Sequence, residues 1–190
     1  MPKILAFAGS GRKNSHNFSI AKCAAEGANV DGVEVTVIDM SEFDMPIFNE
    51  DLEAEKGMPV NAKKFKQLLM SHDGFIIGNP EYNSGYSALI KNAIDWASRM
   101  EDGEKPLQAF KGKYAAIIAA SPGGLGGIRG LVPLRMLLGN IGMHVLPNQL
   151  AVSGVAKLVD ENHNVVDEKT QKNLHGIGRS LAETLLQAAK

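Results

Sequence analysis

The chain has 190 residues, of which 44% are hydrophobic and 22% are charged, a composition that is ordinary for a globular protein and excludes collagen-like and disordered classes. Its length suits one domain, residues 1–190, with a single core. Because 20 Lys and Arg nearly balance 21 Asp and Glu, the net charge of -1 provides no overall field for nucleic acid or for a membrane, and any anion site must be local.

Short apolar runs recur along the chain with the length of strands buried on both faces, at residues 3–8, 33–38, 74–78, 114–120 and 143–146. Amphipathic patterns between and after them predict helices at residues 16–29, 60–71, 86–99, about 128–139 and after Asp167-Glu168. Parallel strands need such crossover helices. The alternation therefore predicts an α/β fold, a flavodoxin-like three-layer sandwich around a five-stranded parallel sheet of order 2-1-3-4-5.

The strand order also predicts where a ligand would bind. Open parallel sheets hold ligands beyond the carboxyl ends of their strands, at the point where the order reverses. That point lies between the first and third predicted strands. Three unusual loops should meet there, with the sequences GSGRKNSHN at 9–17, NPEYNSG at 79–85 and SPGGLGG at 121–127.

The loop at 9–17 has the chemistry of a phosphate site. Unpartnered backbone N–H groups at the start of the following helix favour an anion, and Arg12 offers a charged fork. Neutral hydrogen bonds are available from Ser10, Ser15 and Asn17. The alternative is that Ser15 or Asn17 only caps the helix and that Arg12 is a solvated loop cation. A Walker loop fits poorly because no Gly-Lys-Ser/Thr triplet occurs. A G-x-G-x-x-G dinucleotide fingerprint fits poorly because Asn14 stands where the third glycine is needed.

The other two loops suit a flat ring. In the stretch Pro80 to Gly85, Tyr82 supplies an aromatic wall, and the turn exposes backbone N–H groups. The alternative is an ordinary strand-to-helix turn with Tyr82 half buried. In the loop 121–127, four glycines would let the backbone approach a planar ligand closely, the alternative being a mobile linker.

Three stretches, GSGRKNSHN, PEYNSGYSALIKNAIDW and SPGGLGGIRGLVPLRMLLGNIGMHVLP, resemble the signatures of the NADPH-dependent FMN reductase family, which includes quinone, azo-dye and chromate reductases. The resemblance runs from Lys3 to about Gln149 and implies a flavodoxin-like fold that holds FMN noncovalently. It implies phosphate contacts from Ser10, Arg12, Ser15 and Asn17. It also implies a ring site made by Pro80, Glu81, Tyr82, Asn83 and Ser84 on one side and by Ser121, Gly123 and Gly124 on the other.

The resemblance implies an enzyme that needs no catalytic side chain, because a flavin performs the redox chemistry itself. We expect NADPH or NADH to deliver hydride to flavin N5, and a quinone-like or other small acceptor to take two electrons in a ping-pong cycle. Backbone N–H groups of residues 80–85 would stabilise negative charge at the N1/O2 edge. Glu81 would contact the N3 region through its backbone or be a solvated carboxylate. The alternative function is a non-catalytic flavin-binding or electron-transfer flavodoxin-like protein.

One departure concerns the open face of the ring. The family often has Ser-x-Pro after the PEYN turn, whereas this chain reads Ser84-Gly85-Tyr86-Ser87. Tyr86 thus replaces a compact proline, and we expect it to reshape or partly cover that face.

The remaining features predict structural roles. Cys23 is expected to be a packed, inert thiol, and the five histidines lack metal-ligand spacing, so no metal site is expected. Residues 50–55 read as a solvated connection. The helix at 128–139 is apolar around most of its circumference, so it is deeply buried or shared with another subunit. Family members are commonly dimers or tetramers, which favours a homodimer or homotetramer. A single cysteine and no targeting signal favour the cytoplasm.

Overall fold

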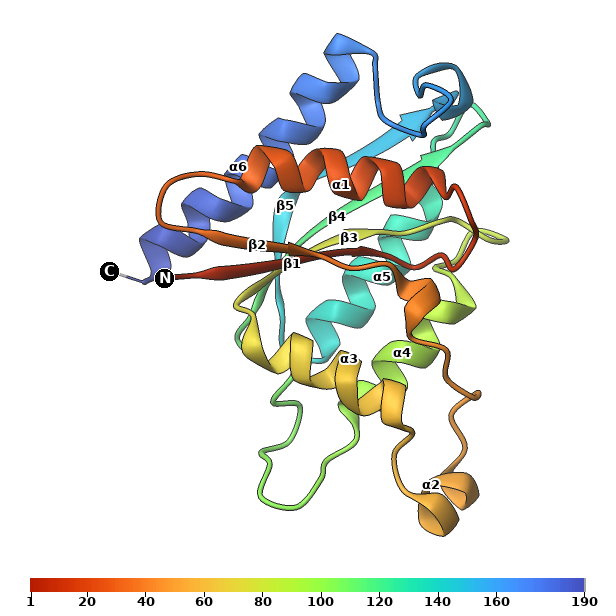
Figure 1. The fold of residues 1–190 in the computed structure, drawn as a ribbon, viewed down its shortest axis with the longest axis vertical. Coiled ribbons are helices and arrows are strands. Elements are labelled where there is room, and N and C mark those ends of the chain that lie inside the picture. The colour runs from red at the N-terminus through yellow and green to blue at the C-terminus, as the bar shows by residue number, and fades with distance from the viewer. Residues whose placement is uncertain (190) are drawn as a thin grey trace.

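The computed structural model describes residues 1–189, and its centre is one five-stranded parallel sheet. Figure 1 shows the strands, which are β1 (Lys3–Ala8), β2 (Glu34–Val37), β3 (Gly74–Gly78), β4 (Tyr114–Ser121) and β5 (His144–Ser153). Their order is β2-β1-β3-β4-β5, and each neighbouring pair is parallel. The predicted fold class and strand order are therefore confirmed.

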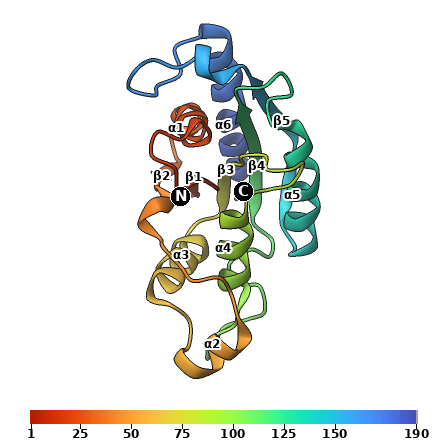
Figure 2. The ribbon, with the colours of Figure 1, turned by 90° about the vertical axis from the view of Figure 1, so that its right-hand side faces the viewer.

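Helices cover both faces of the sheet (Figures 1 and 2). The helices α1 (His16–Ala28) and α6 (Glu168–Ala188) lie on one face, and α3 (Val60–Ser71), α4 (Ala88–Ser98) and α5 (Ile128–Asn140) lie on the other. Successive strand side chains point to opposite faces, so Ile4 of β1 packs with the first group and Leu5 with the second. The result is one apolar core on each face of the sheet, in place of the single core expected from the length of the chain. Within residues 1–189, no helix combines the length and apolarity needed to cross a bilayer.

Strand β5 is longer than the apolar run at 143–146 predicts. Its pairing with β4 steps from Ala115–Val145 to Ile117–Gln149, so residues 146–148 form a bulge. Pro147, which has no N–H group to donate, lies in that bulge on an edge strand, where proline is tolerated. The strand then continues to Ser153.

The connection between β2 and α3 departs from the expected solvated connection at 50–55. It contains a short 3-10 turn at Met40–Glu42 (η1) and a helix, α2 (Glu50–Lys56), that projects away from the sheet in Figure 1. The Asn49 side chain caps α2 by accepting from the N–H groups of Asp51 and Leu52. Acidic residues in the first turn suit the positive end of the helix dipole, so the acidic run that suggested solvent exposure also starts a helix. A second 3-10 turn (η2, Val155–Lys157) follows β5.

A buried ion pair fastens the 99–113 connection to α3. The Lys66 ammonium group is buried, donates to the carbonyl of Arg99 at 2.6 Å and pairs with the Glu104 carboxylate. That carboxylate also accepts from the backbone N–H of Glu101 at 2.9 Å. Burial by itself would raise the pKa of Glu104, but the hydrogen bonds from Lys66 and Glu101 outweigh it and the pKa is lowered.

Removing the carboxylate charge should leave a buried cation without a partner. We expect Glu104→Gln to lower the free energy of unfolding at neutral pH by about 2–3 kcal/mol. Lys63→Gln, which breaks the more exposed pair between Lys63 and Glu101, is the control and should cost less than about 1 kcal/mol.

The same pair predicts a pH dependence. Because the pKa of Glu104 is lower in the folded chain, its contribution is complete above the unfolded pKa near ~4.3 and is lost as the pH falls through the folded value. Urea unfolding across that range should therefore show the gap between wild type and Glu104→Gln closing. A gap that stays constant on acidification would contradict this account.

Candidate functional site

The carboxyl ends of β1, β3 and β4 bring the three unusual loops together, at the right-hand edge of the sheet in Figure 1. A cavity of about 270 Å³ lies between them. Its lining comes from all three loops, namely Ser10, Arg12, Ser15, His16, Asn17, Pro80, Glu81, Tyr82, Ala120, Ser121 and Pro122. The cavity therefore lies at the switch point that the strand order predicts.

The predicted site residues outside this lining are Asn83, Ser84, Gly123 and Gly124. Asn83 and Ser84 form the tip of a two-residue hairpin, because Tyr82 and Gly85 exchange both backbone hydrogen bonds, at 3.1 and 3.0 Å. Both tip residues have positive φ, 51° and 65°, as the two central residues of such a turn require. The tip projects beyond the cavity and leaves Tyr82 exposed beside it.

In the first loop, Ser15 is the N-cap of α1, and its Oγ accepts from the N–H of Phe18 at 3.3 Å. Ser15 therefore does cap the helix, and the cap itself does not decide between the phosphate site and the alternative of capping alone. The Arg12 guanidinium donates to the carbonyl of Asn14 at 2.8 Å, which curls the loop around the helix start. Capping leaves other N–H groups of the first turn without intrahelical acceptors, at the positive end of the helix dipole.

The Asn17 side chain makes structural hydrogen bonds that its residue type alone does not predict. Its amide nitrogen donates to the carbonyl of Ala120 at 3.0 Å, and its amide oxygen accepts from the N–H of Ala120 at 2.9 Å. The side chain is buried, so these bonds tie the first turn of α1 to the end of β4. Among the described residues, the backbone N–H of Asn17 and its second amide hydrogen have no hydrogen-bond acceptor.

The alternative for Glu81, a solvated carboxylate, is wrong, and the expected backbone contact to the ring stays a prediction. Its carboxylate accepts from the N–H groups of Arg129 at 2.9 Å and Gly130 at 3.1 Å, and it pairs with the Arg129 guanidinium at 2.7 Å. Its side chain is only 9% exposed. Burial by itself would raise the pKa of Glu81, but these hydrogen bonds lower it. Glu81 thus neutralises the positive end of α5, and the N-terminus of α1 is left as the anion-attracting end at the cavity.

The glycines of the third loop serve two different purposes. A Cβ atom on Gly126 would lie 2.8 Å from the backbone nitrogen of Ser153, and its φ is +61°, so this glycine is needed for the loop to pack on β5. A Cβ on Gly124 would meet nothing within 4 Å. The glycine-rich composition therefore reflects in part the packing of the loop on β5.

Two aromatic residues are placed differently from expectation relative to the cavity. Tyr86 is partly buried and packs against the apolar cluster on the α3, α4 and α5 side of the sheet, and it does not line the cavity. His16, which the sequence patterns did not select, does line it. Its ring lies 6.2 Å from that of His163, and its pKa is lowered by burial, then by Arg12 and His163. The sequence feature that could have selected His16 as a cavity residue is its position between Ser15 and Asn17, in the first turn of the helix.

Comparisons with known proteins show what this chain is similar to. A sequence model of the family described as NADPH-dependent FMN reductase matches residues 2–157. An NAD(P)H-dependent FMN reductase of Pseudomonas aeruginosa is 34% identical over 171 residues, which cover 90% of this chain and 88% of that protein. An NADPH:quinone oxidoreductase of Arabidopsis thaliana is 32% identical over 184 residues, covering 94% and 89%. Among solved structures, the flavoenzyme NAD(P)H:(acceptor) oxidoreductase FerB of Paracoccus denitrificans gives a TM-score of 0.81, with 30% identity over 98% of both chains.

The tie between α1 and β4 should be energetically important. We expect Asn17→Ala to lower the free energy of unfolding by about 2–4 kcal/mol, because it leaves a buried donor and a buried acceptor of Ala120 unpaired. Ser15→Ala, which removes only the cap, should cost about 1 kcal/mol. Urea denaturation of both variants measures the difference, and equal losses would show that the Ala120 contacts add nothing beyond helix capping.

Proposed function

Because this chain belongs to the NADPH-dependent FMN reductase family, we propose that it is an FMN-dependent NAD(P)H oxidoreductase that reduces a quinone-like or other small acceptor. The observation that carries the proposal is the cavity where the start of α1 meets the loops after β3 and β4. FMN, when bound there, would supply the redox chemistry, taking hydride from NADPH or NADH at N5 and passing on two electrons in a ping-pong cycle.

The phosphate of FMN would lie at the first turn of α1. Free N–H groups and the helix dipole favour an anion there, and Arg12 lies close enough to exchange its hydrogen bond to the Asn14 carbonyl for a charged one. Ser10 and Ser15 line the same part of the cavity and would add hydroxyl contacts. The competing helix terminus, that of α5, is already occupied by the Glu81 carboxylate.

The isoalloxazine ring would lie between the 80–85 turn and the loop that starts at Ser121. At about 270 Å³ the cavity is smaller than the ~300–1,000 Å³ typical of sites that enclose a whole ligand, so part of the ring would stay outside and accessible. That open face is where a nicotinamide and then an acceptor would stack. Tyr82 stands exposed beside it.

The proposal requires no acid or base from a side chain, although the His16 imidazole also lines the cavity. Glu81, its one carboxylate, is engaged by α5. The N–H groups of Tyr82 and Gly85 are used within the hairpin turn. Stabilisation of negative charge at the N1/O2 edge would therefore come from the other backbone donors of this turn, those of Glu81, Asn83 and Ser84.

A homodimer or homotetramer is proposed from the outer face of α5. Leu131, Leu134 and Leu138 are buried on its inner side, whereas Val132 and Met136, one turn apart, are 65% and 63% exposed. The exposed residue Ile128 continues this stripe toward the Glu81 cap and the cavity. A second copy of the chain packed on the stripe would bury it beside the flavin site.

The function is tested with FMN and riboflavin, which differ only in the phosphate. We expect Arg12→Ala to weaken FMN binding about tenfold or more, since a charge-assisted contact is lost, and to change riboflavin binding by less than about twofold. Arg179→Ala, an exposed arginine on α6, is the control and should bind both flavins like wild type. Flavin fluorescence measures the dissociation constants.

Adding NADPH or NADH without oxygen to the FMN-loaded chain should bleach the flavin absorbance, and a quinone should restore it. Bound FMN that neither nucleotide bleaches would support the alternative, a non-catalytic flavin-binding or electron-transfer protein. Equal weakening of FMN and riboflavin by Arg12→Ala would place the phosphate elsewhere.

The subunit contact is tested by a charge placed on the α5 stripe. We expect Val132→Glu to shift the protein toward monomer in size-exclusion chromatography with light scattering, because the carboxylate would be buried in an apolar contact. Val60→Glu is the matched control, since Val60 is 69% exposed at the first turn of α3. A wild-type chain that is already a monomer, or an unchanged mass for Val132→Glu, would contradict the proposed contact.

A further inference from the structure

Helices α1 and α6 touch backbone to backbone. Their crossing takes no part in the proposed reaction. A Cβ atom on Gly178 of α6 would lie 1.8 Å from the carbonyl oxygen of Ala24, and one on Gly27 of α1 would lie 2.3 Å from the Cα of His175. Only glycine permits so close an approach. The positions of side chains beside this crossing are therefore fixed relative to one another by two rigid helices.

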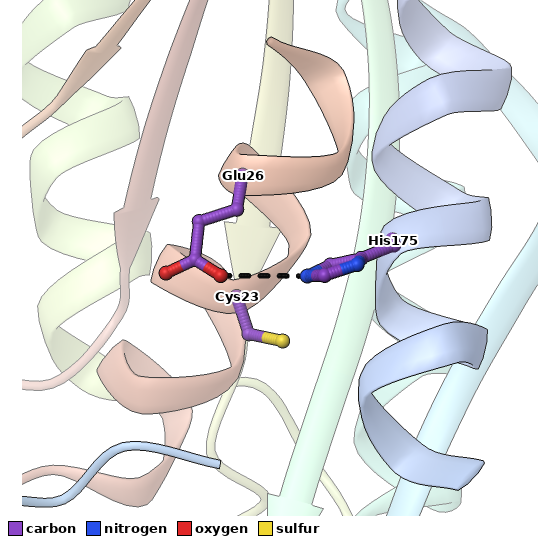
Figure 3. A group of neighbouring side chains, drawn as sticks. All are labelled: Cys23, Glu26 and His175. Atoms are coloured by element: carbon purple, nitrogen blue, oxygen red, sulfur yellow. Dashed lines mark hydrogen bonds and ion pairs between the residues drawn. The ribbon is translucent and has the colours of Figure 1, made fainter. Parts of the chain in front are cut away.

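Three side chains that commonly bind metal ions meet at the crossing (Figure 3). Cys23 and Glu26 are three residues apart on one face of α1, and His175 approaches them from α6. The thiol sulfur, a carboxylate oxygen and an imidazole nitrogen all lie within 4.8 Å of one another. His175 Nε2 and Glu26 Oε2 are already 3.4 Å apart.

We propose that Cys23, Glu26 and His175 form a binding site for a thiophilic divalent cation, of which Zn²⁺ is the best fit. Sulfur, nitrogen and carboxylate oxygen are the ligand types that Zn²⁺ takes in proteins, and a water molecule would complete a four-coordinate shell. The sulfur donor among these three ligands disfavours Mg²⁺ and Ca²⁺, because those ions prefer oxygen ligands.

The geometry needs only a small adjustment. Bond lengths of ~2.0–2.3 Å around zinc place neighbouring ligand atoms roughly 3.3–3.7 Å apart, so the group must contract by about 1 Å. The side chains of Glu26 and His175 are 69% and 40% exposed, and both are free to rotate toward the sulfur. Cys23 is buried and need not move, so the two helices can keep their packing.

The Cys23 thiol must lose its proton before its sulfur can bind Zn²⁺. Burial, and after it the charge of Glu26, raises the pKa of the Cys23 thiol to about 11, so the thiol is neutral at neutral pH without a metal ion. A bound Zn²⁺ would displace the thiol proton to solvent and form a sulfur–zinc bond, which relieves the repulsion between thiolate and carboxylate. The competing interpretation is an ordinary surface contact between His175 and Glu26 above an inert thiol.

The site is separate from the FMN cavity. Cys23 lies eight residues after Ser15, about 12 Å along α1, and none of the three ligands lines that cavity. A bound ion would therefore join α1 to α6 without contacting the cofactor. The expected consequence is higher thermal stability of the folded chain in the presence of Zn²⁺.

The test uses the full-length chain without a histidine tag, freed of metal by a chelator that is then removed. Zn²⁺ affinity is measured by competition with a chromophoric chelator, and Cd²⁺ is used as a probe because thiolate ligation gives an ultraviolet charge-transfer absorption. We expect one equivalent of Zn²⁺ per chain and a thiolate–cadmium band. Cys23→Ala and His175→Gln should each weaken Zn²⁺ binding at least tenfold, and Glu26→Gln should weaken it severalfold.

His163→Gln is the control, because the His163 ring lies 6.2 Å from that of His16, near the Ser15 end of α1, and is no part of the Cys23–Glu26–His175 group. It should bind Zn²⁺ like wild type. Glu26 is so exposed that its replacement cannot prevent folding, which keeps the test valid if the Cys23 variant is unstable. The proposal is overturned if Cd²⁺ gives no thiolate band, or if Cys23→Ala and His175→Gln bind Zn²⁺ as tightly as the unaltered chain, or if only His163→Gln loses it.

Discussion

The pair of hydrogen bonds between the Asn17 amide and the Ala120 backbone is the contact on which the site depends. It joins two segments that are 103 residues apart and fixes the first turn of α1 against the end of β4. The proposed phosphate end of the cavity comes from one of these segments, and the edge near Ser121 comes from the other. A ligand that needs both ends at once can be held only if this distance is constant, and two buried hydrogen bonds to a central strand keep it so.

The N-termini of α1 and α5 both lie near the cavity, but their N–H groups have different partners. The start of α5 receives the Glu81 carboxylate, which satisfies its N–H groups and removes its attraction for anions. The start of α1 receives only the neutral Ser15 cap and has Arg12 beside it. An overall charge of -1 contributes little to this contrast, so the preference for an anion at α1 is a local property of these residues.

The sequence was a reliable guide wherever one local pattern decides the structure. Strands β1 and β3 match their predicted limits because a short apolar run buried on both faces has no competing interpretation. The end of β5 was missed because the bulge at Pro147 interrupts the apolar pattern, and α2 was missed because an acidic run looks the same in a solvated loop and in a capped first turn. Convergence of the loops followed from topology alone.

Partners that are distant in sequence could not be predicted, since no local pattern records them. Glu81 and Arg129 are 48 residues apart, and Glu26 and His175 are 149 residues apart. Histidine spacing along the chain therefore gave no hint of the group at the α1–α6 crossing. In the same way, the glycine-rich loop suggested a ligand, whereas Gly126 is needed for packing on β5.

The most direct measurement is a crystal structure of the chain grown with FMN. The account predicts that the phosphate accepts hydrogen bonds from backbone N–H groups in the first turn of α1 and from Arg12. It also predicts that the ring lies between Tyr82 and the loop after β4, while the Asn17–Ala120 bonds stay intact. A phosphate at the start of α5, or a flavin bound away from the ends of β1 and β3, would contradict it.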